Sequence, residues 1–147
     1  MTADASVPTT GAHASLVGLG ARVHLFIRPG RAEAFTVLFR DVLRCTVLER
    51  DFGLEHPVLL VRFDDGSSFS VEVTDLAPAA DDGLRIDDGR AFRGAWIEFR
   101  ARDVDVLLAR LRAAGVPEFR HPGSGHAYFA APGGQVFRLL DVGYAGP

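Results

Sequence analysis

The sequence contains no lysine and no asparagine, and all 16 basic residues among its 147 are arginine. Without lysine, the chain cannot form a Schiff base with a carbonyl substrate. Its single cysteine, Cys45, excludes an intrachain disulfide and a cysteine-rich zinc module. The formal net charge of −3 leaves no positive excess for phosphate contacts. We therefore expect a protein that binds no nucleic acid.

Long hydrophobic runs are also missing from the sequence. No stretch reaches the roughly 20 apolar residues that a membrane-spanning helix needs. Residues 1–20 lack the basic start and apolar centre of a secretory signal, and we interpret them as a mobile tail. With 48% hydrophobic and 24% charged residues, the composition is that of a globular domain. We expect a cytoplasmic protein without membrane contact.

In the first half of the chain, strand-like runs flank one helical pattern. Phe35, Leu38, Phe39 and Val42 recur at i, i+3, i+4 and i+7, which predicts an amphipathic helix over 31–43. Runs rich in β-forming residues predict strands over 22–28, 46–52, 58–63 and 68–74. Residues 21–76 are therefore expected to form a first βαβββ module.

The same order of elements returns after a linker. Residues 77–93 are rich in Asp, Gly, Ala and Pro and show no clean period. Beyond them, Val104, Leu107, Leu108 and Leu111 predict a second helix that ends at Gly115, a residue suited to a helix C-terminus. Strands are predicted over 95–100, 118–121, 126–130 and 135–142. A second module is thus expected over 94–143.

The two halves are also in register. Trp96 follows His24 by 72 positions, and Leu111 follows Phe39 by the same number. Internal repeats of this kind predict pseudo-twofold symmetry, with a cavity where the halves meet. The sequence therefore predicts an α+β fold of two βαβββ modules.

In this order and spacing, the chain resembles the vicinal oxygen chelate superfamily, which includes glyoxalase I, extradiol dioxygenases, fosfomycin resistance proteins and bleomycin-binding proteins. The resemblance covers residues 22–142. The matching segments are the opening strand with His24, Phe39–Leu43, Asp103–Asp105 through Leu111–Val116, and Ala127–Phe137. The resemblance implies two curved mixed sheets that form an open, barrel-like cleft.

In metal-using members of this superfamily, four sheet positions supply the ligands. The resemblance places them on His24, Glu72, Trp96 and Arg138. An imidazole and a carboxylate suit a divalent metal. Trp offers only an N–H donor, however, and Arg carries a fixed positive charge and no lone pair. We therefore expect a degenerate metal site and a protein that needs no cofactor.

Glu98 offers an alternative. Side chains alternate along a strand, so Glu98 shares a face with Trp96. His24, Glu72 and Glu98 would then provide one nitrogen and two oxygens for Mn, Fe, Ni or Zn. Against this, Arg138 opposite Glu72 or Glu98 would form an ion pair in the space that a metal would occupy.

Other side chains are candidates for ligand contacts. His24 and Glu72 are candidate catalytic groups, because histidine and carboxylates move protons. Arg138 could hold an anion through its planar fork or form a structural salt bridge. The aromatic side chains of Trp96 and Phe26 offer flat apolar surfaces for a ligand or for core packing. Near the last hairpin, His126 and Tyr128 are candidate ligand contacts, or incidental loop residues. Glu98 completes the candidate binding set.

Three functions follow from these residues. The first is metal-independent binding or sequestration of a small organic molecule, as in the drug-binding relatives, which work as dimers; we expect a homodimer. The second is a metal-dependent lyase, isomerase or dioxygenase that uses His24, Glu72 and Glu98. The third is a metal-free enzyme in which His24 or Glu72 moves a proton while Arg138 holds an anionic substrate.

Overall fold

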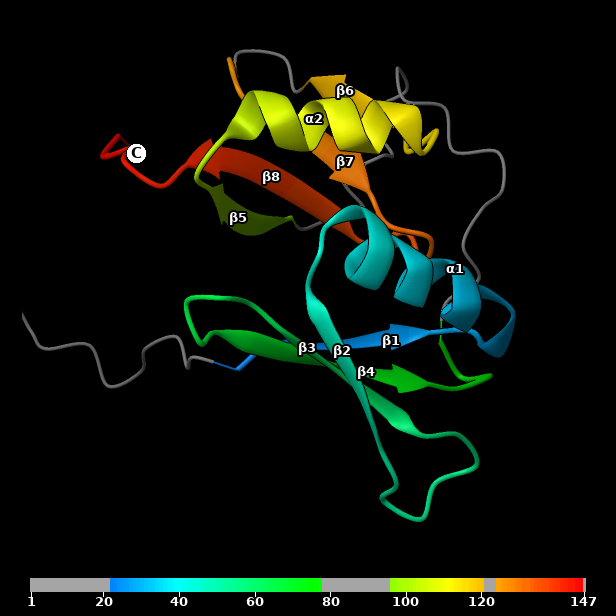
Figure 1. Ribbon diagram of the computed structural model, residues 1–147. Coiled ribbons are helices and arrows are strands. Elements are labelled where there is room, and N and C mark those ends of the chain that lie inside the picture. Colours follow the sequence, from blue (N-terminus) through cyan, green and yellow to red (C-terminus); the bar gives the residue numbers. More distant parts are fainter. Residues whose placement is uncertain (1–21, 78–95, 121–123, 147) are drawn as a thin grey trace, which may run out of the picture.

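A computed structural model describes residues 22–77, 96–120 and 124–146 of the chain. The first module contains β1 (His24–Ile27), the short 3₁₀ turn η1 (Pro29–Arg31), α1 (Ala32–Val37), the π-helical turn η2 (Leu38–Val42), β2 (Thr46–Arg50), β3 (Val58–Arg62) and β4 (Ser68–Val73). The second contains β5 (Ile97–Ala101), α2 (Val104–Ala113), β6 (Glu118–Arg120), β7 (Ala127–Ala130) and β8 (Val136–Asp141). Figure 1 shows the two modules one above the other.

Both sheets have the same topology. Their strand orders are β1-β4-β3-β2 and β5-β8-β7-β6, with the first strand parallel to the last and the other pairs antiparallel. The two mixed sheets do not close on each other. This confirms the predicted α+β fold of two similar modules. The expected tail lies outside the described residues, as does the expected linker apart from Ala77.

The first helix changes its pitch before it ends. At η2, the Leu43 N–H donates to the carbonyl of Leu38, five residues back, at 2.9 Å. This widened turn still presents Leu38 and Phe39 to the core. The exposed Arg44 then adopts φ 60°, a left-handed conformation that reverses the chain into β2.

The second helix has conventional ends. The Asp103 carboxylate caps the start by accepting from the Val106 N–H at 2.9 Å. At the other end, Gly115 has φ 69°, and the Val116 N–H donates to the Leu111 carbonyl at 2.9 Å. This is a Schellman ending, and it confirms the prediction that Gly115 terminates the helix.

One apolar core joins the two modules. Phe39 on the first helix is fully buried, and its ring lies 5.3 Å from that of Phe69 in the first sheet and 5.7 Å from that of Phe137 in the second. Phe69 and Phe137 also contact each other, at 6.3 Å between ring centroids. In Figure 1, α1 lies between the two sheets. The sheets therefore pack through the faces that carry these aromatic rings.

Alternation along the strands then fixes the position of the polar residues. Glu72 alternates with the buried Val71 and Val73, and Arg138 alternates with the buried Phe137 and Leu139. Both polar side chains therefore lie on outer faces, turned away from the shared core. Within one chain, the candidate residues of the two sheets occupy separate surfaces and do not line one cleft, which differs from the expected arrangement.

The two modules also meet at a turn. The Gln135 side-chain amide donates to the backbone carbonyl of Phe26 at 3.1 Å. Gly133 packs so closely against Ile27 and Gln135 that an added Cβ would clash with both side chains. The turn between β7 and β8 therefore rests on β1. No helix in the described part of the chain is long and apolar enough to cross a membrane.

Candidate functional site

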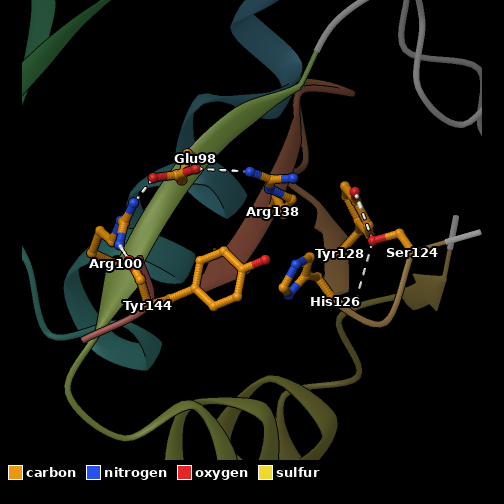
Figure 2. Close-up of polar contacts among 7 residues, drawn as sticks. All are labelled: Glu98, Arg100, Ser124, His126, Tyr128, Arg138 and Tyr144. Carbon is orange, nitrogen blue, oxygen red and sulfur yellow. Dashed lines mark hydrogen bonds and ion pairs between the residues drawn. The ribbon is translucent and has the colours of Figure 1, made fainter. Parts of the chain in front are cut away.

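The outer face of the second sheet carries a carboxylate held between two arginines (Figure 2). Glu98 on β5 lies opposite Arg138 on β8, and Arg138 Nη2 donates to Glu98 Oε2 at 2.9 Å. Arg100, two residues along the same strand, donates from Nε to Glu98 Oε1 at 2.7 Å. The hydrogen bond from Arg138, with help from Arg100, lowers the pKa of Glu98. The same bond raises the pKa of Arg138. Of the two open pairings, the structure selects Glu98 as the partner of Arg138.

Arg138 also lies across the indole ring of Trp96. Its guanidinium carbon is 4.1 Å from the ring centroid, a distance typical of a cation–π contact. The Arg138 side chain is mostly buried, whereas Trp96 keeps 41% of its surface exposed. Trp96 therefore contacts the arginine and still offers apolar surface to a ligand. Tyr128 is buried beside it, with ring centroids 6.3 Å apart.

One side of this face is formed by the segments that precede β7 and follow β8. The rings of His126 and Tyr144 meet edge to face at 4.9 Å. The Tyr144 carbonyl accepts from Arg100 Nη1 at 2.6 Å. Ser124 Oγ accepts from the Tyr128 hydroxyl at 3.4 Å. Figure 2 shows Tyr144 and His126 facing each other across this part of the surface.

Three of these residues, Arg100, Ser124 and Tyr144, were missed by the sequence reasoning. The alternation that places Glu98 beside Trp96 also places Arg100 on the same face, so this arginine could have been found. Tyr144 lies beyond the end of the last strand, and no periodicity marks its position.

The outer face of the first sheet carries a second polar group. His24 Nε2 lies 3.5 Å from Glu72 Oε2, and His24 Nδ1 lies 2.6 Å from Ser70 Oγ. The rings of His24 and Phe26 meet edge to face with centroids 4.9 Å apart, and Phe26 is 47% exposed. Ser70 was also missed, although the run Ser68–Glu72 alternates polar and apolar residues and places Ser70 on the face of Glu72.

The proposed metal ligands are not assembled within one chain. His24 and Glu72 lie on the first sheet, whereas Glu98 lies on the second, where both its oxygens accept from arginines. In residues 22–77, 96–120 and 124–146, no three His, Cys, Asp or Glu side chains are grouped closely enough to hold a metal ion. The carboxylate, imidazole and thiol donors of the described residues therefore do not form a metal centre within one chain.

Cys45 packs against the apolar core. Burial raises the pKa of its thiol to about 11, which keeps it protonated at neutral pH. A protonated thiol is a poor nucleophile, so Cys45 acts as a small apolar side chain at the edge of the core.

Comparisons with known proteins identify the fold. No family model and no curated protein matches the sequence. Among solved structures, the chain is similar to TnmS3, an antibiotic binding protein from Streptomyces sp. CB03234, with a TM-score of 0.58 and 18% identity; the match covers 86% of this chain and 98% of that one. A glyoxalase/bleomycin resistance protein from the same source gives a TM-score of 0.52 and 21% identity, covering 79% and 96%.

A third similar structure is the fosfomycin resistance protein FosX from Listeria monocytogenes. Its TM-score is 0.57 at 15% identity, and the match covers 85% of this chain and 91% of that one. The chain therefore has the fold of the vicinal oxygen chelate superfamily, to which these glyoxalase-like and resistance proteins belong. This confirms the fold that the sequence resemblance implied.

Proposed function

We propose that this chain is a glyoxalase/bleomycin resistance-like protein that binds a small, planar, anionic organic molecule without a metal. The contact of Arg138 with Trp96 is the observation that carries the proposal. It places a fixed positive charge directly beside an exposed aromatic surface. A planar ligand would stack on the indole, and its anionic group would reach an arginine.

The charges of this face favour an anion. Glu98 neutralises one of the two arginines that it contacts, so these three side chains retain one net positive charge. Arg138 Nε is buried and has no hydrogen-bond partner within the described residues. Glu98 holds the guanidinium in place, and an already ordered group loses less entropy when a ligand arrives.

The similar structures support small-molecule binding. TnmS3 is an antibiotic binding protein, and two other matches are resistance proteins of the same fold. At 15–21% identity, these likenesses concern the scaffold. The binding role of this chain therefore rests on its own residues.

The proposal includes a homodimer in which the first sheet of one copy covers the second sheet of the other. The outer faces carry the exposed rings of Phe26, on the edge strand β1, and of Trp96, immediately before the edge strand β5. Their charges are complementary, because Glu72 lies on one face and the excess positive charge lies on the other. Such a dimer would bring His24 and Glu72 of one copy towards the ligand on the other.

The test uses the single tryptophan as a reporter. Because Trp96 is the only Trp in the chain, quenching of tryptophan fluorescence by anthraquinone-2-carboxylate monitors this face alone. We expect saturable quenching. Arg138→Gln should weaken binding about 10- to 100-fold, the range for loss of a charged hydrogen bond.

The matched control is Arg112→Gln. Arg112 forms a two-point ion pair with Glu118 on the same module, away from the proposed site. Its replacement removes the same charge and should leave the affinity unchanged. Linear, non-saturating quenching, or equal weakening by both variants, would contradict the proposal.

A further inference from the structure

Ser70, His24 and Glu72 lie next to one another on the outer face of the first sheet. The serine hydroxyl lies 2.6 Å from Nδ1 of His24, and the opposite ring nitrogen lies 3.5 Å from the Glu72 carboxylate. The parallel pairing of β1 and β4 sets this geometry, because His24 is directly opposite Ser70. The resemblance places no ligand position on Ser70.

The Glu72 carboxylate lies 3.5 Å from Nε2 and favours one position for the imidazole proton. An ionised carboxylate can only accept hydrogen bonds, so Glu72 favours the tautomer with the proton on Nε2. In that tautomer, Nδ1 has a free lone pair. The Ser70 hydroxyl must then donate to Nδ1, which is the arrangement of a hydroxyl nucleophile and its general base.

We propose that Ser70 is a nucleophile activated by His24 and that the chain hydrolyses small, apolar aryl esters. Ser70 Oγ forms a bond to the ester carbonyl carbon, and its proton passes to His24 Nδ1. The bond to the aryl oxygen breaks, and the phenolate leaves and takes up that proton. Water then attacks the acyl-serine with His24 as base, which releases the carboxylic acid and restores the serine.

The surroundings of Ser70 define the class of ester. Phe26 and the half-buried Leu60, which is opposite Ser70 on β3, form an apolar surface beside the hydroxyl. Strand β4 is paired on both sides, so its backbone N–H groups are already engaged in the sheet. The strand therefore supplies no free backbone N–H group to stabilise the oxyanion. We expect slow turnover that requires a good leaving group, and a small acyl group that fits beside the two apolar side chains.

The probe is p-nitrophenyl acetate, added to the wild-type protein. We expect release of p-nitrophenol and a transient mass increase of one acetyl group, which peptide mapping places on Ser70. Ser70→Ala should abolish this label. His24→Gln keeps a hydrogen-bonding side chain but cannot take up the proton, so it should slow labelling at least about 100-fold.

Two variants serve as matched controls. Ser68 lies two residues from Ser70 on the same face of β4 and is exposed, so Ser68→Ala should label at the wild-type rate. His56, which lies 4.0 Å from Glu55, is a second His–Glu pair, and His56→Gln should have no effect. Acetylation that maps elsewhere, or that persists in Ser70→Ala, overturns the proposal.

In the proposed homodimer, the ester would enter between the two facing sheets, but esterase activity and ligand binding are measured separately. A protein that binds anthraquinone-2-carboxylate but is not acetylated at Ser70 contradicts the esterase proposal alone. A protein that is acetylated at Ser70 but does not bind the anthraquinone contradicts the proposed function alone.

Discussion

Arg138 covers part of the Trp96 ring, with its guanidinium carbon 4.1 Å from the ring centroid and its Nη2 donating to Glu98. The resemblance places metal ligands of related proteins at the positions of Arg138 and Trp96. Here the two side chains contact each other, and the nearby carboxylate holds the arginine. The position that would hold a metal ligand in a relative thus carries the positive charge of Arg138, which favours anionic ligands.

Replacement of Arg138 by glutamate should change the metal affinity of this face. We expect that elemental analysis of wild-type protein, after incubation with Mn, Fe, Ni or Zn ions and gel filtration, finds no stoichiometric metal. Arg138→Glu replaces a fixed cation by an oxygen donor beside Glu98 and should increase the metal retained. Near-stoichiometric metal in the wild type would point to an enzyme that uses His24, Glu72 and Glu98 and would contradict the proposal.

Glu98 should make stability depend on pH in acid. Its pKa in the folded protein is below its ordinary value of 4.5, chiefly because Arg138 donates to it. The Glu98 carboxylate therefore contributes stability that is present above about pH 4.5. This contribution is lost as the pH falls through the pKa of Glu98 in the folded protein. The difference in unfolding free energy between wild type and Glu98→Gln should shrink as the pH is lowered below this range.

Urea denaturation at several pH values measures this difference. Glu33→Gln is a suitable control, because Glu33 is exposed in the first turn of α1. If the difference for Glu98→Gln stays constant down to low pH, the ion pair with Arg138 does not contribute to stability.

Arg44 is the one described non-glycine residue with a positive φ, and Arg44→Gly should stabilise the protein. A left-handed conformation costs an ordinary residue about 1–2 kcal/mol. Glycine avoids this cost but gains entropy in the unfolded chain, so a net gain of about 0.5–1 kcal/mol is expected.

The matched control is Arg110→Gly, which replaces an exposed arginine inside the α2 helix. It should destabilise the protein by about 1 kcal/mol, because glycine disfavours a helix interior. Thermal unfolding measures the stability of both variants, and we expect a gain for Arg44→Gly and a loss for Arg110→Gly. A loss of stability in Arg44→Gly would show that the left-handed turn carries no strain.

The homodimer predicts that Phe26 is covered in solution. Sedimentation equilibrium should give the mass of two chains for the wild type, and Phe26→Asp should shift the protein towards the monomer. Phe52→Asp is the control, because Phe52 is 70% exposed in the loop between β2 and β3, away from this face. A wild-type monomer at the concentrations used for ligand binding would refute the dimer.

Most of the fold could be predicted from the sequence. The helical spacing of Phe35 and Phe39, the alternation around Phe69 and Phe137, and the stop at Gly115 are local signals that the structure confirms. They are informative because core burial imposes a different period on helices and strands.

The site was harder to predict, because alternation shows which residues share a face but not what that face meets. The sequence left open whether Arg138 pairs with Glu72 or Glu98, and only the parallel register of β5 and β8 decides it. It also could not show that the aromatic faces of the sheets pack together. That packing turns the first sheet's His24 and the second sheet's Glu98 to separate outer faces.

Metal-free ligand binding at Trp96 and Arg138 is tested most directly by calorimetry. The wild-type protein is dialysed against EDTA and titrated with anthraquinone-2-carboxylate, then titrated again after Mn, Fe, Ni or Zn ions are restored. We predict saturable binding of the same affinity in every titration. Binding that disappears after EDTA and returns with a metal ion would contradict the account.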